Sequence, residues 1–275
     1  MASLFDAFRY DGKRVLVVGG ASGMGAAAAE LVQDAGAEVM VMDFAKVSLT
    51  GAKAIHVNLA ESASIDAAVK ECGASVDALF SCAGVADGTP GIEKINFIGH
   101  RHLIDRLLER DMLPRGSAIG FISSNAGLGW ETNLPQLLEF LATPDFDAAV
   151  AWVEQHGKAD YIWSKQAICA YVASRALPLL KRGIRINAIC PGPTDTPLAQ
   201  ANKERWLGFG TDYRSVVGMQ PFAPLEQAYA LAFLCSEAAA AITGVTLISD
   251  AGYISSGITG SFPAATPFVN LFFNR

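Results

Sequence analysis

The sequence predicts an α/β fold, a doubly wound parallel sheet covered by helices on both faces. Three observations predict it. Short, almost wholly apolar segments alternate with helical patterns, a glycine-rich turn follows the first of them, and 275 residues, 51% of them hydrophobic, are enough for one large core. No internal repeat and no linker rich in Pro, Gly or Ser divides the chain, so we expect a single domain over residues 1–275.

The predicted elements follow one another in the order that such a sheet requires. Strands are predicted at residues 13–18, 38–42, 54–58, 76–81, 118–123, 184–190 and 245–249. Helices are predicted at residues 24–35, 62–72, 92–110, 161–181 and 225–236. Because crossovers between parallel strands are right-handed, ligands should bind beyond the carboxyl ends of the strands.

Two stretches interrupt the alternation. Residues 128–159 form an insertion before the helix at 161–181, and the pattern over residues 145–155 predicts a helix inside it. Residues 197–224 form a long polar and aromatic connection after a strand end. Long connections in compact domains are usually lids or binding loops, so we expect the second stretch to be a substrate loop.

Composition excludes several classes of function. A net charge of −6 gives no attraction to phosphate backbones, so no nucleic-acid partner is expected. No early segment has the pattern of an export signal, and no apolar run is long enough for a membrane span. The cysteines are scattered without CxxC spacing, which favours free thiols in a reducing cytoplasm and gives no support for a metal site. They are Cys72, Cys82, Cys169, Cys190 and Cys235.

A glycine-rich turn follows the first predicted strand and opens the first predicted helix. Glycines there allow a tight turn and bring backbone N–H groups close to a pyrophosphate at the positive end of the helix. Strand, turn and helix in this order predict a dinucleotide site. Its expected binding residues are Gly19, Ala21, Ser22, Gly23, Met24 and Gly25.

Asp43 closes the second predicted strand, where a carboxylate accepts hydrogen bonds from the adenosine ribose. A 2′-phosphate beside Asp43 would be repelled, and the glycine-rich turn contains no Arg or Lys. These charges favour NAD over NADP, although Lys46 lies close in sequence. The alternative is that Asp43 only caps a turn.

Tyr161 and Lys165 are four residues apart, on one face of a predicted helix. A free phenol has a pKa near 10, and an ammonium group held beside it favours the phenolate. A general acid/base needs such tuning, so the pair is a candidate catalytic group. On its own the spacing is common on helix surfaces, and the alternative is a structural role.

Together with further motifs, these features resemble the short-chain dehydrogenase/reductase family over nearly the whole chain. Ser81-Cys82-Ala83-Gly84 is similar to the family's Asn-Asn-Ala-Gly, and Cys190–Thr196 is similar to its Pro-Gly-x-x-x-Thr segment. The resemblance implies a Rossmann fold and, beyond the turn and Asp43, a further set of cofactor contacts. They are Asn58 and Leu59 at the adenine, Cys82, Ala83 and Gly84 at its ribose, and Ile189, Pro191, Gly192, Thr194 and Thr196 at the nicotinamide amide.

Four positions depart from the family pattern. Val18 stands where the family usually has Thr, which removes one hydroxyl from the turn, and Ser81 and Cys82 stand where it has two Asn residues. Asn58 replaces the common Asp, and its carbonyl can still reach an exocyclic amine.

The resemblance also implies four catalytic residues. Ser124 and Tyr161 would hold the substrate oxygen, and Tyr161 would exchange the hydroxyl proton. Lys165 would lower the pKa of Tyr161 and bind the nicotinamide ribose, and Asn96 would anchor a proton-relay water. This set favours an enzyme over a catalytically silent NAD-sensing regulatory protein, which is the alternative from another class.

The insertion narrows the resemblance to the bacterial 3α-hydroxysteroid dehydrogenase/carbonyl reductase group and the related coniferyl alcohol dehydrogenases. It predicts a small hydrophobic substrate, a hydroxysteroid or ketosteroid, with a coniferyl-type aromatic alcohol as the alternative. The resemblance implies a homo-oligomer, either dimer or tetramer. The apolar tail at residues 267–273 is expected to dock on a neighbouring subunit. Aromatic and apolar residues expected either to line the pocket or to pack are Trp130, Leu134, Phe140, Trp152, Trp206, Phe209, Tyr213, Met219 and Phe222.

Overall fold

The computed structural model describes residues 5–273 of the chain. Its centre is a sheet of seven parallel strands in the order β3-β2-β1-β4-β5-β6-β7. The predicted doubly wound α/β fold is therefore confirmed. The strands are β1 (Arg14–Val18), β2 (Glu38–Asp43), β3 (Lys53–His56), β4 (Ala78–Ser81), β5 (Ala118–Ile122), β6 (Arg185–Pro191) and β7 (Thr246–Ser249).

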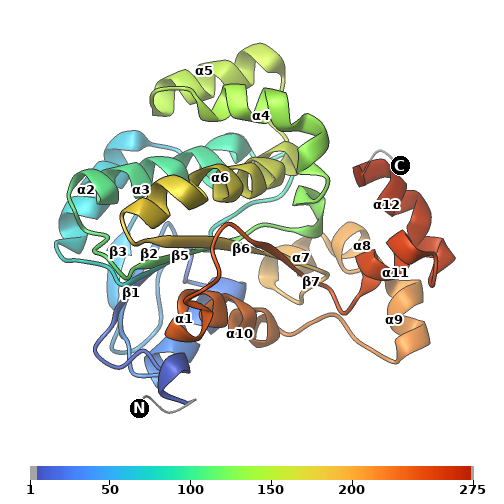
Figure 1. The fold of residues 1–275 in the computed structure, drawn as a ribbon, viewed down its shortest axis with the longest axis horizontal. Helices are drawn as coiled ribbons and strands as arrows, with labels where there is room; N and C mark the ends of the chain where they lie inside the picture. The colour runs from blue at the N-terminus through green and yellow to red at the C-terminus, as the bar shows by residue number, and fades with distance from the viewer. Residues whose placement is uncertain (1–4, 274–275) are drawn as a thin grey trace.

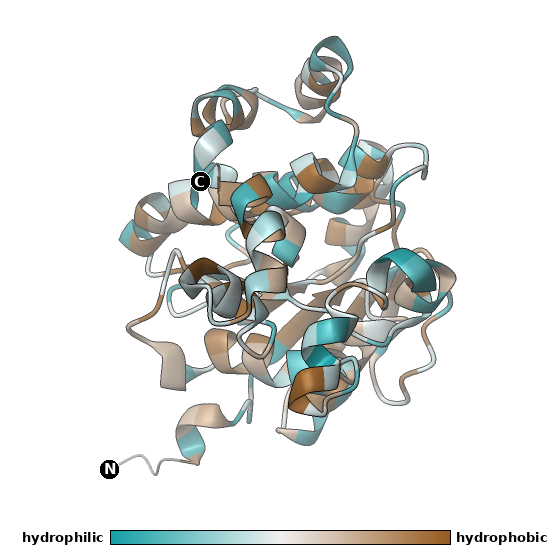
Figure 2. Ribbon diagram, turned by 90° about the vertical axis from the view of Figure 1, so that its right-hand side faces the viewer, coloured by the Kyte–Doolittle hydropathy of each residue, from teal (hydrophilic) through white to brown (hydrophobic). Residues whose placement is uncertain are grey.

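Helices cover both faces of this sheet (Figure 1). One face carries α1 (Gly23–Asp34) and α10 (Pro224–Cys235), and the other carries α2 (Ser62–Cys72), α3 (Gly99–Glu109) and α6 (Tyr161–Lys181). The strands are mostly apolar, whereas the helices carry both hydrophobic and hydrophilic residues (Figure 2). This distribution is what burial of a parallel sheet on both sides requires.

The strand order reverses between β1 and β4, which pair directly with Val18 opposite Ser81. On its other edge β1 pairs with β2, with Val18 opposite Met42. The segments that follow these three strands therefore leave the sheet side by side. Such a reversal is where open α/β sheets bind ligands.

The helix predicted at residues 92–110 begins at residue 92, as expected, but is not α-helical throughout. A π-helical turn, η2 (Lys94–Ile98), lies inside it and leads into α3. Single π turns inside helices occur often at functional sites. Asn96, a predicted catalytic residue, lies in this turn.

The insertion at residues 128–159 contains two helices, α4 (Leu134–Leu141) and α5 (Phe146–His156), where one had been predicted. Pro135 at the start of α4 is a usual helix-opening residue that the prediction passed over. Both helices lie on the outer side of α6, above the sheet in Figure 1. Short 3₁₀ turns precede them at η3 (Asn125–Gly127) and η4 (Trp130–Asn133).

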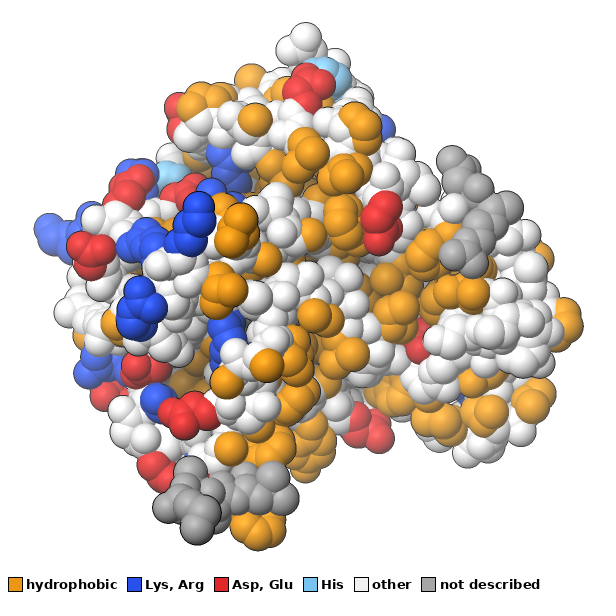
Figure 3. Space-filling view, viewed as in Figure 1, with side chains coloured by type: hydrophobic (Ala, Val, Ile, Leu, Met, Phe, Trp, Pro, Cys, Tyr) orange, Lys and Arg blue, Asp and Glu red, His pale blue; other side chains and the backbone are white. Residues whose placement is uncertain are grey.

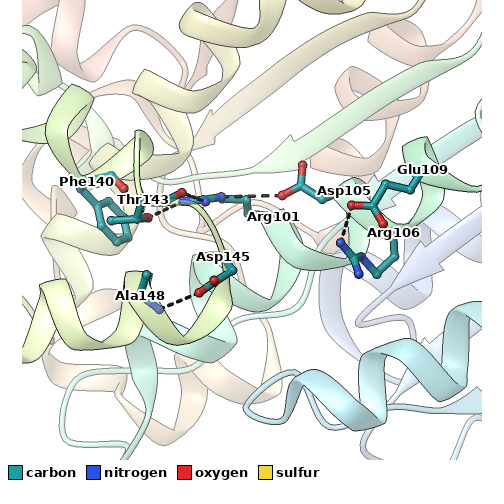
Figure 4. A network of polar contacts seen from close by, with 8 residues as sticks. All are labelled: Arg101, Asp105, Arg106, Glu109, Phe140, Thr143, Asp145 and Ala148. Carbon is teal, nitrogen blue, oxygen red and sulfur yellow. Dashed lines mark hydrogen bonds and ion pairs between the residues drawn. The ribbon is translucent and has the colours of Figure 1, made fainter.

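Arg101 of α3 ties the insertion to the body (Figure 4). Its guanidinium donates to the Thr143 hydroxyl at 2.9 Å and to the Thr143 carbonyl, in the turn between α4 and α5. Asp105 lies 3.8 Å from the same guanidinium. Asp145 then caps α5 by accepting from the Ala148 N–H at 2.9 Å.

A lobe of short helices lies beyond the carboxyl ends of the strands, and we call it the end lobe. It consists of α7 (Pro197–Ala201), α8 (Lys203–Trp206), α9 (Thr211–Val217), α11 (Tyr253–Thr259) and α12 (Thr266–Phe273). Three further 3₁₀ turns are η1 (Asp6–Phe8), η5 (Glu237–Ala239) and η6 (Pro263–Ala265). No helix within residues 5–273 is both long and apolar enough to cross a bilayer.

The apolar tail lies against its own chain over part of its surface. Helix α12 packs on its own chain, with Val269 1% and Phe272 9% exposed. Val269 belongs to a buried cluster with Leu128 and Cys169 of the body. The chain itself therefore provides the apolar surface for these two side chains, whereas Leu271 of the same helix is 75% exposed. Docking of the exposed part of the tail on a neighbouring subunit stays a prediction.

Candidate functional site

Two connected hollows lie at the carboxyl ends of the strands. The first, of about 460 Å³, runs past the glycine-rich turn and Asp43, and we call it the cleft. The second, of about 390 Å³, contains Ser124 and Tyr161, and we call it the chamber. The two hollows adjoin each other, because they share five lining residues, which are Met24, Cys82, Gly84, Thr196 and Leu198.

The glycine-rich turn is shaped by close backbone approaches. Gly19 has φ +87°, and a side chain there would overlap the backbone of Ala83, which follows β4. A side chain at Gly25 would overlap the carbonyl of Gly19. Only glycine fits at either position, and the turn therefore brings the N-terminus of α1 to the edge of the cleft. Ser22, Gly23 and Met24 line the cleft beside it.

Asp43 lies at the end of β2 and lines the cleft. Its carboxylate accepts hydrogen bonds from the Ala21 N–H and the Ala45 N–H, both at 2.8 Å. Asp43 therefore does cap a turn, as the alternative interpretation of this residue proposed. This cap leaves room for ligand binding, because each carboxylate oxygen accepts more than one hydrogen bond. Lys46 is exposed and is not among the residues that line the cleft.

The other residues predicted at this end of the cleft also lie there. Asn58 accepts from the Ala60 N–H at 3.0 Å through its carbonyl and donates to Glu61 at 2.8 Å. Leu59, Cys82, Ala83 and Gly84 complete the wall.

At the chamber floor, Ser124 and Tyr161 come together from different elements. Ser124 follows β5 and accepts from the Ala126 N–H at 3.1 Å, whereas Tyr161 is the first residue of α6. Burial raises the pKa of Tyr161 to about 12, although a hydrogen bond from Ser124 acts in the opposite direction. Ser123 is turned away, since its hydroxyl donates to the Lys165 carbonyl.

Lys165 lies one helical turn after Tyr161 and is only 4% exposed. Its Nζ is 5.5 Å from the centre of the Tyr161 ring and donates to the Ile122 carbonyl at 3.1 Å. Burial lowers the pKa of Lys165 to about 8. Burial of the phenol is the largest influence on its pKa, and the expected lowering of that pKa by Lys165 stays a prediction.

Asn96 is fully buried and does not line the chamber. Its carbonyl accepts from the Val85 N–H at 2.7 Å, and its amide donates to the Val85 carbonyl and to Ser164, both at 3.1 Å. These bonds tie the loop after β4 to α6. Both N–H groups of the Asn96 amide are thus engaged within the chain. The role of Asn96 in a water relay stays a prediction.

The segment after β6 forms the junction of cleft and chamber. Pro191, Gly192 and Thr194 line the chamber, and Thr196 lines both hollows. Thr196 caps α7 by accepting from the Ala199 N–H at 3.1 Å. Ile189 is fully buried in the sheet.

Sequence analysis missed Asp87 and the α12 side chains of the chamber. Asp87 accepts from the Tyr161 N–H at 2.8 Å and lies 3.1 Å from Arg205 of α8. Phe268, Leu271 and Phe272 form part of the chamber wall. No sequence signal connects these residues to Tyr161, because their contacts arise only in the folded chain.

Within residues 5–273 the five cysteines are all free. No group of three or more His, Cys, Asp or Glu in the same range is placed to hold a metal ion.

Comparisons with known proteins agree with this geometry. A family profile described as enoyl-(acyl carrier protein) reductase matches residues 145–254. A cis-4-hydroxycyclohexanecarboxylate dehydrogenase of Sinomonas cyclohexanicum is 30% identical, over 88% of this chain and 96% of its own. The chain belongs to the short-chain dehydrogenase/reductase family. The predicted resemblance to this family is thereby confirmed, and with it the Rossmann fold that the resemblance implied.

Two other members of this dehydrogenase/reductase family are similar at comparable levels. The coniferyl-alcohol dehydrogenase of a Pseudomonas strain is 28% identical, over 89% of this chain and 97% of its own. A 3α-hydroxysteroid dehydrogenase from Pseudomonas sp. B-0831, solved in complex with NADH, is 28% identical with a TM-score of 0.72, over 90% of this chain and 99% of its own. The insertion had predicted similarity to hydroxysteroid dehydrogenases and to coniferyl alcohol dehydrogenases, and a protein of each kind is therefore among the relatives of this chain.

Proposed function

We propose that this chain is an NAD(H)-dependent oxidoreductase that interconverts a hydrophobic alcohol and its carbonyl compound. The observation that carries the proposal is the meeting of Ser124, Tyr161 and Lys165 in a chamber that adjoins the glycine-rich cleft. A hydroxyl pair and a buried cation at one end of a dinucleotide-shaped cleft suit carbonyl and alcohol chemistry.

The cleft fits a dinucleotide on its own chemistry. Gly19 and Gly25 keep side chains out of the turn, so that backbone N–H groups of α1 can meet a pyrophosphate. Asp43 would hold the adenosine ribose and disfavour a 2′-phosphate. Asn58 and Leu59 would lie at the adenine and Cys82, Ala83 and Gly84 at its ribose, with Ala21, Ser22, Gly23 and Met24 in the turn and Ile189, Pro191, Gly192, Thr194 and Thr196 toward the nicotinamide.

Each polar residue of the chamber has a distinct task in this proposal. The nicotinamide, when bound, supplies or accepts the hydride. Ser124 donates a hydrogen bond to the substrate oxygen, and the Tyr161 hydroxyl gives it a proton in reduction and removes one in oxidation. With the pKa of Tyr161 at about 12, the phenol is a proton donor at neutral pH, which suits reduction directly. Oxidation requires additional positive charge in the cleft to lower that pKa.

Lys165 and Asn96 would act around this pair. Lys165 supplies positive charge beside the phenol and would bind the nicotinamide ribose. Because the pKa of Lys165 is lowered to about 8, it keeps its proton at neutral pH and loses it in alkali. Asn96 fixes the loop after β4 against α6, and we propose that it also supports a proton relay to solvent.

For the substrate, we propose a hydroxysteroid or ketosteroid. The apolar lining of the chamber and the similarity to a 3α-hydroxysteroid dehydrogenase favour it. A coniferyl-type aromatic alcohol is the second candidate, favoured by the relative of that name. The presence of both Tyr161 and Lys165 disfavours a catalytically silent NAD sensor.

We also propose that the protein works in the cytoplasm as a homo-oligomer. The free cysteines support a reducing compartment. Exposed apolar side chains on α6 and α10, such as Leu177 at 64% and Tyr229 at 56%, support subunit contacts.

The main test measures NAD⁺ reduction with a steroid, a cinnamyl-type and an aliphatic alcohol, in the native chain and in Tyr161→Phe. Loss of the phenolic proton should lower kcat by at least about a thousandfold. The dissociation constant of NADH, measured by its fluorescence, should change by less than about threefold because the fold is kept. Turnover retained by Tyr161→Phe, or no turnover of any alcohol by the native chain, would refute the proposal.

Cofactor choice is tested separately by Asp43→Ser. Removal of the carboxylate should weaken NADH and improve NADPH, shifting the ratio of their dissociation constants by about a hundredfold. Lys46→Ser is the control, because Lys46 is absent from the lining of the cleft, and it should leave the ratio near its native value.

A further inference from the structure

Helix α12 lies against the chamber although it is the last helix of the chain. Phe268, Leu271 and Phe272 line the chamber from α12, together with Trp206 and Phe209 of the connection between α7 and α9. In Figure 1 the helix stands beside α8 and α11, beyond the ends of the strands, and Figure 3 shows hydrophobic side chains gathered where this lobe meets the body. The chamber thus has an apolar outer side made by the chain's own tail.

The seat of α12 is built into the fold. Gly129 has φ +70°, and a side chain there would overlap the Phe272 carbonyl, so the body keeps this position open for the helix backbone. Gly257 of α11 is similarly close to Val269, and Val269 is 1% exposed. The Phe268 ring lies 4.4 Å from the rings of both Phe209 and Phe272. These contacts hold α12 from both sides within one subunit.

Three charged side chains line the chamber among the described residues, and they are Asp87, Lys165 and Arg205. Asp87 and Arg205 neutralise each other at 3.1 Å, and Lys165 lies at the floor behind Tyr161. The remaining polar lining is near Ser124 and the segment after β6. Among residues 5–273, α12 brings no charged side chain to the chamber, so a carboxylate or phosphate buried against Phe268 and Phe272 would have no counter-charge from this helix, which is unfavourable. An uncharged hydrocarbon skeleton would instead bury apolar surface there.

We propose that α12 is the outer wall of the substrate chamber in its own subunit, and that this wall selects uncharged alcohols whose ring skeleton extends from the carbinol carbon to α12. The inference rests on the proposed function, which concerns the chemistry at the chamber floor. It adds that the chamber is complete in one subunit, so that no neighbouring chain closes it.

The first test replaces Phe272 by Ala and compares kcat/KM for a 3-hydroxysteroid with that for cyclohexanol. Both are secondary ring alcohols, and only the larger skeleton can span from Ser124 to α12. The ratio should fall about tenfold in the variant, with the dissociation constant of NADH unchanged. Phe5→Ala is the matched control, since Phe5 is 78% exposed at the opposite end of the chain. An unchanged ratio in folded Phe272→Ala would overturn the inference.

The second test uses Leu271, which is 75% exposed, so that its replacement does not disturb packing. Leu271→Glu places a carboxylate at the wall, and Leu271→Gln is its uncharged counterpart of similar size. We expect KM for the steroid to rise at least fivefold in the Glu variant and less than twofold in the Gln variant. Equal KM values in the two variants would contradict selection against charge.

The third test asks which subunit provides the wall. Tyr161→Phe and Phe272→Ala chains are co-expressed and purified as mixed assemblies. If α12 acts within its own subunit, the mixture keeps the steroid-to-cyclohexanol ratio of Phe272→Ala alone. Recovery of the native ratio would show that a neighbour's tail covers the chamber and would overturn the inference. If the native chain turned over no alcohol at all, the proposed function itself would fall, whereas normal turnover with unaltered selectivity would remove only the role of α12.

Discussion

The insertion and the end lobe are alike in sequence and different in what they do. Both interrupt the strand–helix alternation, and both carry aromatic residues that were expected to line a pocket or to pack. In the insertion, Phe140 and Trp152 are 1% and 8% exposed, within the core on the outer side of α6. In the end lobe, Trp206 and Phe209 line the chamber. Both segments follow the carboxyl ends of strands, and the difference lies in which surface each of them packs on.

The position of each region explains why the insertion packs in a core whereas the end lobe lines the chamber. The end lobe lies across the carboxyl ends of the strands, where open α/β sheets bind ligands, so its apolar side chains face the chamber. The insertion folds back over the helical layer, where the neighbouring surface is the apolar side of α6. Helix α6 serves both regions, because Trp163 packs under the insertion whereas Tyr161 and Lys165 line the chamber.

A pair of tryptophan substitutions should separate the two regions most strongly. The Trp152 ring is stacked 5.7 Å from that of Trp163, and Trp152→Ala should lower the free energy of unfolding by about 3–5 kcal/mol. Trp206→Ala should cost less, because Trp206 is only half-buried beside the Tyr161 ring at 5.1 Å. Urea melts and the kcat/KM ratio of the two alcohols measure both effects. We expect selectivity to change only in Trp206→Ala, and the reverse pattern would overturn the comparison.

The next effect concerns how the insertion is tethered. Arg101 is 7% exposed, and Arg101→Ala leaves the Thr143 groups and the half-buried Asp105 without this partner, which should cost about 2–3 kcal/mol of stability. Arg106→Ala on the same helix is the control, because Arg106 pairs at the surface with Glu109 and should cost under about 0.5 kcal/mol. Chemical denaturation compares them. Equal losses would mean that the Arg101 contacts add nothing to the attachment.

The sequence was enough to predict the sheet, the cleft and the floor of the chamber, because each depends on local patterns. Gly19 and Asp43 follow strands, and Tyr161 and Lys165 share a helix face. The walls were not predictable in the same way. Asp87 meets Tyr161 across 74 positions of the chain, and Phe272 meets Gly129 only after the tail folds back. Aromatic content alone did not distinguish Trp152 from Trp206, since burial in a core and lining of a pocket require the same side chains.

The burial of Lys165 in α6 can be tested through the pH dependence of the free energy of unfolding. Burial lowers its pKa from 10.5 to about 8, so between these values the unfolded chain binds a proton that the folded chain does not. Stability contributed by this group must therefore rise with pH from about 8, at a slope of up to about 1.4 kcal/mol per pH unit. Lys165→Met should lose this slope, and urea melts at pH 8 and 9 compare the two proteins. Parallel changes in the two would show that the ammonium is not desolvated.

The range stops at pH 9 for a physical reason. Burial raises the pKa of Cys235 to about 12 and raises the pKa of Cys82 further. Free thiols lose their protons around pH 9 whereas these buried thiols keep them, so the thiols lower stability increasingly as the pH rises through that value. The difference between the native chain and Lys165→Met isolates the effect of Lys165.

The smallest expected effect lies at the tether of the end lobe. Arg205 is 69% exposed, and its ion pair with Asp87 should contribute under about 1 kcal/mol to stability. Arg205→Gln should nevertheless raise the steroid KM two- to fivefold at low salt, because α8 carries Trp206 onto Tyr161. High salt should bring the native KM toward that of the variant, since exposed ion pairs are screened.

Asp87→Asn separates the two roles of Asp87, which pairs with Arg205 and accepts a hydrogen bond from the Tyr161 N–H. Asparagine keeps an oxygen that accepts from the Tyr161 N–H but has no charge for Arg205. If the ion pair alone matters, Asp87→Asn and Arg205→Gln should give the same KM and the same loss of salt dependence. A lower kcat in Asp87→Asn alone would mean that the carboxylate acts on Tyr161 directly. The end lobe would then regulate the chemistry as well as the fit of the substrate, which the insertion, on the far side of α6, has no means to do.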